Sequence, residues 1–387
     1  MRIATKIIHH PGAYCEHTGA VSFPIYQVST FKQEGVGRNK GYDYSRSGNP
    51  TRDVLEKYIA SLESGKFGFG FSSGMAAISA CIMLLKAGDH LIATEGLYGG
   101  TYRVLTRVFT NFNVSCSFVD TSNLDAVKAA FRENTKAVFL ETPSNPVMRI
   151  TDIAAIAELA HKRGALVMVD NTFMSPWLQR PLEFGADIVI HSATKFLGGH
   201  SDLIMGLVAA NDETVASRVK FLQNAVGAVP SPFDCWLLMR GMKTLGVRLS
   251  YGQASAGKIA QWLLGRPEVE KVLYAGLEGS EGYEVHCRQA DGPGAVLSFV
   301  LRSGVSAETL VGNLSLWTLA VSLGAVESIV TVPARMTHLV YPRNELERLG
   351  ITDRLVRLSV GIEDPDDLIA DLEAGLKKTT AARGGKT

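Results

Sequence analysis

Between residue 51 and about residue 210, short apolar runs alternate with amphipathic segments, and this pattern limits the possible folds more than any other feature of the chain. Within the runs, apolar and polar residues do not alternate, which is typical of parallel strands covered on both faces by helices. The segments between them carry apolar residues at helical spacing. We therefore expect a large α/β domain with a parallel-type sheet. The expected strands are 90–94, 114–119, 137–140, 166–169, 188–190 and 203–209, and the expected helices include 74–86, 123–133 and 152–163.

The two ends of the chain differ from this pattern. Residues 1–50 are rich in Gly, Pro, Ser, Tyr and His, and their aromatic residues argue against disorder, so we expect an arm that contacts a neighbouring subunit. Thr51 is expected to cap a helix with an apolar face. Residues 212–264 read as mostly helical, and strand and helix patterns return after Pro267. We expect an arm over 1–50, a large domain over 51–250 and a smaller C-terminal α/β domain over 251–387.

Composition excludes several classes of protein. The formal net charge of +1 gives no reason to expect nucleic acid or an anionic membrane as a partner. No apolar run is long enough to span a bilayer, and the first ten residues lack the apolar core of a signal peptide. The five cysteines are scattered without CxxC spacing, which indicates reduced thiols and no metal site. The expected location is the cytoplasm.

Polar residues follow two of the expected strands. The run 165–169 ends at Asp170, and the run 186–190 leads into Ser192, Thr194 and Lys195. An acid can pair with a pyridine nitrogen, hydroxyls can bind a phosphate, and a lysine can attach an aldehyde covalently. Together at the ends of two buried strands, these residue types predict a site for pyridoxal 5'-phosphate (PLP).

Other segments add candidate contacts for this cofactor and for a substrate. Gly74 opens an expected helix whose free N–H groups suit a phosphate, and Arg46 lies in a loop rich in Gly and Pro. Tyr98 follows a strand and can stack on a flat ring, and Asn145 is held between two prolines. Arg357 lies within an apolar strand and needs an anionic partner. Each feature alone has an ordinary explanation: a helix cap, an exposed loop, a core tyrosine, a turn and an internal ion pair.

Taken together, these motifs closely resemble the Cys/Met-metabolism family of PLP enzymes. The resemblance extends from about Thr5 to Leu376 and implies PLP fold type I, the aspartate-aminotransferase-like fold. The motifs that carry it are Tyr-Ser-Arg-Ser-Gly-Asn-Pro-Thr at 44–51, Ser-Ser-Gly-Met-Ala at 72–76, Tyr-Gly-Gly-Thr at 98–101, Glu-Thr-Pro-Ser-Asn-Pro at 141–146, Asp-Asn-Thr-Phe at 170–173, Ser-Ala-Thr-Lys at 192–195 and Arg-Leu-Ser-Val-Gly at 357–361.

The resemblance implies a role for each candidate residue. Lys195 carries the cofactor, Asp170 pairs with its pyridine nitrogen and Tyr98 stacks on its ring, so these are the expected catalytic residues. Phosphate contacts are implied for Gly74, Met75, Ser192 and Thr194 and, from the neighbouring subunit, for Tyr44 and Arg46. Contacts with the substrate carboxylate are implied for Asn145, Ser322 and Arg357. The family also implies a homotetramer built from two active dimers.

A few positions bear on the substrate. Arg103 resembles the basic residue that family members offer to the distal carboxylate of cystathionine, and Gly100 replaces the cysteine usual in methionine γ-lyases. Val321 and Asp43 resemble cystathionine lyases of Gram-positive bacteria, whereas the segments 221–224 and 229–232 resemble γ-lyases. We expect a carbon–sulfur lyase acting on cystathionine, with β-elimination slightly favoured over γ-elimination. A cystathionine γ-synthase is the alternative, and a methionine γ-lyase is less favoured.

Two other classes of protein are alternatives to a PLP-dependent lyase. A Rossmann oxidoreductase would share the alternation of strands and helices, but the glycines of 65–70 are in the wrong order for a dinucleotide fingerprint. A non-catalytic binding protein on the same fold is expected to lack Lys195 or Asp170, and both are present.

Overall fold

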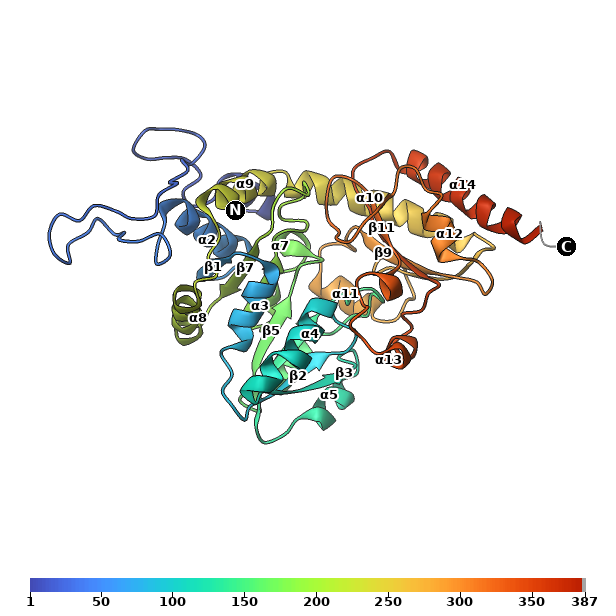
Figure 1. The fold of residues 1–387 in the computed structure, drawn as a ribbon, viewed down its shortest axis with the longest axis horizontal. Coiled ribbons are helices and arrows are strands. Elements are labelled where there is room, and N and C mark those ends of the chain that lie inside the picture. The colour runs from blue at the N-terminus through green and yellow to red at the C-terminus, as the bar shows by residue number, and fades with distance from the viewer. Residues whose placement is uncertain (385–387) are drawn as a thin grey trace.

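A computed structural model describes residues 1–384 of the chain and contains two sheets with helices packed against them (Figure 1). The final three residues of the expected C-terminal domain lie outside the described residues. The larger sheet has seven strands in the order β1-β7-β6-β5-β4-β2-β3. Its strands are β1 (Phe67–Phe71), β2 (His90–Thr94), β3 (Ser115–Val119), β4 (Thr135–Glu141), β5 (Leu166–Asp170), β6 (Ile188–Ser192) and β7 (Gly206–Ala210).

The central strands of this sheet are buried on both faces, as their unbroken apolar sequences predict. On β2, Leu91 and Ala93 enter one apolar cluster, which also contains residues of α3 (Gly74–Ile82). Ile92, on the opposite face of the strand, packs instead with residues of α6 (Ile153–His161). Since successive side chains of a strand point to opposite faces, helices on both sides require apolar residues at every position.

The expected α/β fold, with a large sheet and a second, smaller sheet, is confirmed, and the large sheet is mixed. Strands β3, β2, β4, β5 and β6 are parallel, but β7 runs antiparallel to both β6 and β1. The connection 193–205 between β6 and β7 contains no helix. A parallel neighbour requires a crossover, so this short return reverses the strand.

Strand β1, Phe-Gly-Phe-Gly-Phe, was not expected from the sequence, because its glycines weaken the strand pattern. Its glycines let α2 (Pro50–Leu62) pack directly against the sheet. A Cβ atom on Gly68 would lie 2.0 Å from the carbonyl oxygen of Glu56. A larger residue at 68 would therefore push the helix away from the strand.

The helix predicted after residue 50 is present, but Thr51 does not cap it. The side-chain oxygen of Asn49 accepts hydrogen bonds from the backbone N–H groups of Thr51 and Arg52, and Pro50 is the first helical residue. The Thr51 hydroxyl instead bonds to backbone atoms of the arm. Asn is as good a cap as Thr, and Pro favours the first helical position.

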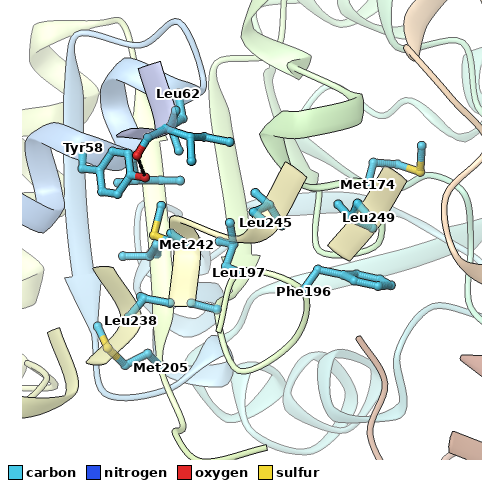
Figure 2. Packing of buried hydrophobic residues seen from close by; sticks show 14 of the residues in the cluster. Tyr58, Leu62, Met174, Phe196, Leu197, Met205, Leu238, Met242, Leu245 and Leu249 are labelled. Carbon is cyan, nitrogen blue, oxygen red and sulfur yellow. Dashed lines mark hydrogen bonds between the residues drawn. The ribbon is translucent and has the colours of Figure 1, made fainter. Parts of the chain in front are cut away.

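The apolar face of α2 is buried in a core beneath the cavity described below (Figure 2). The Tyr58 hydroxyl donates to the carbonyl oxygen of Ile7, so the first helix of the chain is joined to this core. The predicted face of the helix is confirmed: Val54, Leu55, Tyr58, Ile59 and Leu62 are all buried.

Helices connect the strands and lead into the second sheet. The mostly helical character expected for 212–264 is confirmed by α8, α9 and α10. Residue 250, the expected domain boundary, lies within α10. The helices are α1 (Ile3–Ile8), α4 (Gly99–Arg107), α5 (Leu124–Ala130), α7 (Ser175–Leu178), α8 (Glu213–Val226), α9 (Pro232–Met242), α10 (Leu245–Leu264), α11 (Tyr283–Gln289), α12 (Ala307–Val311), α13 (Arg343–Arg348) and α14 (Pro365–Gly384), besides α2, α3 and α6.

The second sheet has five strands in the order β10-β11-β12-β9-β8 and is antiparallel except for the pair β10–β11. Its strands are β8 (Val269–Leu273), β9 (Val296–Leu301), β10 (Thr318–Leu319), β11 (Ile329–Thr331) and β12 (Leu355–Ser359). A separate apolar cluster joins it to α10, α12 and α14. Alternating strands and helices after residue 267 were expected, although β11, α11 and α13 were not.

After α1, which packs against the core, much of the segment up to residue 50 forms loops that project from the body of the molecule (Figure 1). Several of their apolar side chains are exposed, among them Tyr14, Val21, Val36 and Tyr44. Among the helices that the structure describes, none is long and apolar enough to cross a bilayer.

Candidate active site

A cavity of about 670 Å³ lies at the carboxyl ends of the parallel strands and is closed on one side by residues of the second sheet. Open α/β sheets bind their ligands at this edge. Of the fourteen predicted site residues, twelve line the cavity: Gly74, Met75, Tyr98, Arg103, Asn145, Asp170, Ser192, Thr194, Lys195, Val321, Ser322 and Arg357.

Lys195 follows β6 and is half-buried in the cavity. Its Nζ donates a hydrogen bond to the Ser322 hydroxyl at 2.8 Å. Burial, with a smaller contribution from the positive charge of Arg357, lowers the pKa of Lys195 from 10.5 to about 8. Because a neutral amine is the nucleophile and the base, this environment prepares Lys195 for both functions near neutral pH.

Asp170, at the end of β5, is buried and has no cationic side chain in contact with it among the described residues. It accepts hydrogen bonds from the Thr172 backbone N–H at 3.1 Å and from the Thr172 hydroxyl at 2.5 Å. Burial raises the pKa of Asp170, and these two hydrogen bonds oppose the rise. A positively charged N–H group bound in the cavity would supply the missing countercharge, which is what a pyridine nitrogen provides when protonated.

The start of α3 offers a cradle for a phosphate. The first N–H groups of a helix have no partner within the helix, and the Ser73 side chain accepts only that of Ala76. The N–H groups of Gly74 and Met75 therefore remain available to an anion. A Cβ atom on Gly74 would lie 2.8 Å from the Cβ of Ser192, so only glycine lets the helix start approach this hydroxyl.

Thr194 lies on the same side of the cavity as Ser192. Its hydroxyl accepts a hydrogen bond from the Met205 backbone N–H at 3.1 Å, which fixes the side chain. Two hydroxyls and two backbone N–H groups thus converge at one end of the cavity. This donor set matches a phosphate dianion and fits the predicted cofactor.

Arg357 provides a second anion site at the other end. Its Nη1 donates to Asn145 Oδ1 at 3.0 Å and its Nη2 donates to the Ser322 carbonyl oxygen at 2.6 Å. Its Nε is buried without a hydrogen-bond partner among the described residues. Burial lowers the pKa of Arg357 to about 10. A buried guanidinium with a free donor is suited to bind a carboxylate.

Glu141 was not among the predicted site residues, yet it holds two of them in place. Its carboxylate accepts hydrogen bonds from the backbone N–H of Tyr98 at 3.0 Å and from that of Asn145 at 2.8 Å. Burial raises the pKa of Glu141 above its ordinary value, and the charge of nearby Asp170 adds to the rise. An acid at the end of an apolar strand was the available signal, the same one that identified Asp170.

Tyr98 and two other predicted residues lie toward the mouth of the cavity. Tyr98 remains partly exposed, and a Cβ atom on Gly100 would lie 2.4 Å from its ring. Arg103 is exposed and makes no ion pair with another described residue. Val321 is 62% exposed, so this part of the wall offers an apolar surface and no hydrogen bond.

Tyr44 and Arg46 are the predicted residues that the structure does not bring to the cavity of their own chain. Arg46 Nη1 donates to the Asn224 carbonyl oxygen at 2.6 Å and its guanidinium lies 5.6 Å from the centre of the Tyr44 ring. Both side chains are exposed. A role at the cofactor would require a second copy of the chain.

Comparisons with known proteins agree with this geometry. The family model described as Cys/Met metabolism PLP-dependent enzyme matches residues 4–377. The chain is 50% identical over 377 residues to cystathionine gamma-lyase of Bacillus subtilis (strain 168), covering 97% of this chain and 100% of that protein. It is 51% identical over 376 residues to cystathionine beta-lyase MetC of the same strain, covering 97% and 96%.

A solved structure shows the same fold. Cystathionine gamma-lyase from Lactobacillus plantarum, crystallised in complex with L-serine, superposes with a TM-score of 0.97 at 46% identity, covering 98% of this chain and 100% of that one.

Proposed function

The chain belongs to the Cys/Met metabolism family of PLP-dependent enzymes, and on this basis we propose that it is a carbon–sulfur lyase that cleaves cystathionine. Relatives named for this activity are about half identical over nearly the whole chain. One observation supports the proposal most directly. The half-buried Lys195 contacts Ser322, whose carbonyl oxygen is bound by the carboxylate-binding Arg357.

The residues fit pyridoxal phosphate at both of its polar ends. Gly74, Met75, Ser192 and Thr194 would hold the phosphate, Asp170 would pair with the ring nitrogen, and Lys195 would hold the cofactor covalently. When bound, the cofactor supplies an electron sink for the pair of electrons left at the substrate Cα. Tyr98, which lines the cavity and is partly exposed, would cover the ring.

Lys195 is the group that moves protons. Its lowered pKa leaves a useful fraction neutral near neutral pH, so it can take the proton from the substrate Cα. The Ser322 hydroxyl, which accepts from Nζ in the structure, holds the amine at the boundary between the two anion sites. Arg357 and Asn145 would bind the α-carboxylate of the substrate and so direct the Cα proton toward Lys195.

The distal half of cystathionine determines which bond breaks. Arg103 is free to bind its carboxylate, whereas Val321 can neither accept a hydrogen bond from its amino group nor order water there. Loose positioning allows either end of the molecule to react, because a misplacement of about 1 Å can change a rate by about 100-fold. We infer that β-elimination, which gives homocysteine, pyruvate and ammonia, takes place, with γ-elimination to cysteine, 2-oxobutyrate and ammonia beside it.

The two keto acids separate these outcomes. Purified enzyme incubated with cystathionine should release pyruvate, with or without 2-oxobutyrate, and both can be quantified by chromatography after derivatisation. Release of 2-oxobutyrate alone would make the enzyme a γ-lyase. Release of neither, with cystathionine formed from an activated homoserine and cysteine, would make it a γ-synthase.

The domain and subunit arrangement belongs to the same proposal. We infer an arm over 1–50, a cofactor domain over 51–250 and a C-terminal domain over 251–387, assembled as a homotetramer of two active dimers. Support comes from the exposed aromatic residues of the arm and from Arg46, which bonds to Asn224 and is not among the residues that line the cavity of its own chain. Mixing inactive Lys195→Ala and Arg46→Ala subunits should restore partial activity. If subunits exchange and no activity returns, Arg46 does not act across the interface.

A further inference from the structure

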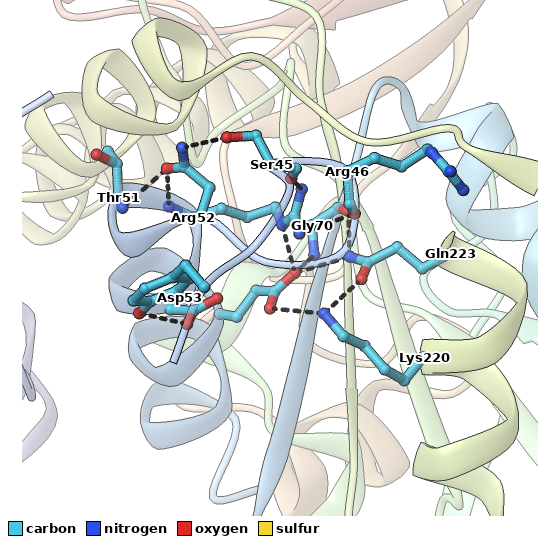
Figure 3. A network of polar contacts seen from close by, with 11 residues as sticks. Ser45, Arg46, Thr51, Arg52, Asp53, Gly70, Lys220 and Gln223 are labelled. Carbon is cyan, nitrogen blue, oxygen red and sulfur yellow. Dashed lines mark hydrogen bonds and ion pairs between the residues drawn. The ribbon is translucent and has the colours of Figure 1, made fainter. Parts of the chain in front are cut away.

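Arg52, on α2, is a buried cation whose donors point at the backbone of the arm (Figure 3). Its Nη1 donates to the Ser45 carbonyl oxygen at 2.8 Å and its Nη2 donates to the Arg46 carbonyl oxygen at 3.1 Å. The residue is 1% exposed. Two bonds from one rigid guanidinium fix both the position and the direction of the chain at these residues.

Glu56, one turn further along α2, holds Arg52 in place. The Nε of Arg52 lies 3.4 Å from Glu56 Oε1, and both side chains are buried. The same oxygen accepts from the Gly70 backbone N–H at 2.9 Å and from the Gln223 side chain at 2.7 Å. The Nε contact is an ion pair without a hydrogen bond, since Nε has no hydrogen-bond partner among the described residues. Removal of the Glu56 carboxylate would leave the buried guanidinium without this countercharge, which is why the pair keeps Arg52 beside Glu56.

This network connects two regions that serve different active sites in the proposed assembly. Gly70 lies on β1, and the chain proceeds from it directly to the phosphate cradle at Gly74. Ser45 and Arg46 lie on the arm, outside their own cavity. One polar cluster therefore sets the position of the arm relative to the cofactor domain that carries it.

We propose that Arg52 is a positioning residue that aims Arg46 at the cofactor phosphate of the neighbouring subunit. This inference rests on the proposed function, in which Arg46 acts across the interface. The side chain of Arg46 bonds to Asn224 in the single chain and has to leave that contact in order to meet an anion. Its backbone is already held by Arg52, so the entropy of ordering the arm is lost on folding and not on cofactor binding.

The substitution Arg52→Lys isolates this role. Lysine keeps the positive charge opposite Glu56, but its single ammonium cannot bond both carbonyl oxygens in the geometry of the guanidinium fork. We expect the cofactor to leave the holoenzyme about 10-fold faster, the lower end of the effect found when the partner that orients a metal ligand is removed. Release is followed by the loss of visible absorbance after dilution. Lys57→Ala, an exposed cation on the same helix, is the matched control and should leave the release rate unchanged.

Mixed assemblies show in which subunit Arg52 acts. In the first mixture, Arg52→Lys subunits are co-expressed with a large excess of Lys195→Ala subunits. Nearly every intact Lys195 then receives its arm from a subunit with a native Arg52, and release should be slow. In the second, wild-type subunits are co-expressed with a large excess of the double variant Arg52→Lys, Lys195→Ala. The arm beside each intact Lys195 then comes from a subunit that carries Arg52→Lys, and cofactor release should be fast.

Three results would overturn the inference. Fast release in the first mixture would show that Arg52 acts within its own subunit, through Gly70. Cofactor release that is equally slow in both mixtures, or an unchanged release rate for Arg52→Lys alone, would show that the Arg52 guanidinium does not position the arm. If Arg52→Lys subunits do not assemble, the Glu56→Gln substitution, which removes the ion pair, takes its place, and the rate of cofactor release is measured in the same two mixtures.

The Arg46→Ala enzyme separates this inference from its premise. Fast release from Arg46→Ala together with slow release from Arg52→Lys would reject the role of Arg52 alone. Slow release from Arg46→Ala would reject the contact between Arg46 and the phosphate, and the inference with it.

Discussion

Lys195 and Ser322, which are 127 residues apart in the chain, meet across the cavity through a hydrogen bond of 2.8 Å from Nζ to the hydroxyl. Lys195 follows a strand of the large sheet, whereas Ser322 lies between two strands of the smaller one. The bond therefore joins the two sheets at the reacting group. Ser322 also occupies an unusual backbone conformation, with φ at 110°.

The backbone of Ser322 gives a first prediction. A residue with a Cβ atom is strained at this φ, and glycine is not, so Ser322→Gly should unfold at a higher temperature than Ser322→Ala. The free energies of unfolding of the two variants should differ by about 1 kcal/mol. Both variants lose the hydroxyl, so this bond does not contribute to the comparison. Thermal unfolding of the two apoenzymes tests it, and equal melting temperatures would show that the conformation is not strained.

The covalent site is a second prediction. Reduction of the holoenzyme with borohydride, followed by peptide mass mapping, should place the pyridoxyl group on Lys195. Lys195→Ala should lower turnover by several orders of magnitude, because the variant lacks both the attachment point and the base. A pyridoxyl group on any other lysine would refute the assignment.

The pH dependence of cofactor capture is a third prediction. Since only the neutral amine reacts, a pKa of about 8 for Lys195 means that capture by the apoenzyme accelerates as pH rises through 8 and then levels off. The neutral fraction is about 10% at pH 7 and about 90% at pH 9. Stopped-flow absorbance measures the rate. Nα-acetyl-lysine is the control, and its rate should keep rising until about pH 10. An enzyme profile that follows the control would mean that burial does not shift this pKa.

Val321 leads to a fourth prediction, about the products. A glutamate at this exposed position can accept a hydrogen bond from the distal amino group of cystathionine, which the valine cannot do. Val321→Glu should therefore raise the share of 2-oxobutyrate in the keto acids formed from cystathionine. Val321→Gln, which adds similar bulk without the charge, is the control and should raise it less. A lower share in the glutamate variant would contradict this account of regiochemistry.

Local chemistry determined much of the fold and most of the candidate site. The apolar strands were predictable because burial on both faces leaves an unbroken apolar run, as in β2 and β5. Asp170 was predictable because it directly follows such a run, and Lys195 because it stands in the short hydroxyl-containing segment just after another. The cap of α2 was misassigned, because Asn49 and Thr51 are both good caps and only the observed hydrogen bonds distinguish them.

By itself, the sequence determined which residue types stand at the ends of the strands, and therefore the cofactor chemistry. Only the tertiary structure decided that β7 reverses, that Glu141 holds Tyr98 and Asn145, and that Arg52 binds the arm. Tyr98 and Glu141 are far apart in the chain, and even near neighbours such as Ser45 and Arg52 meet only because the loop between them folds back. The energies of these contacts depend on distances and burial that exist only after the elements have packed, so no local pattern of residues records them.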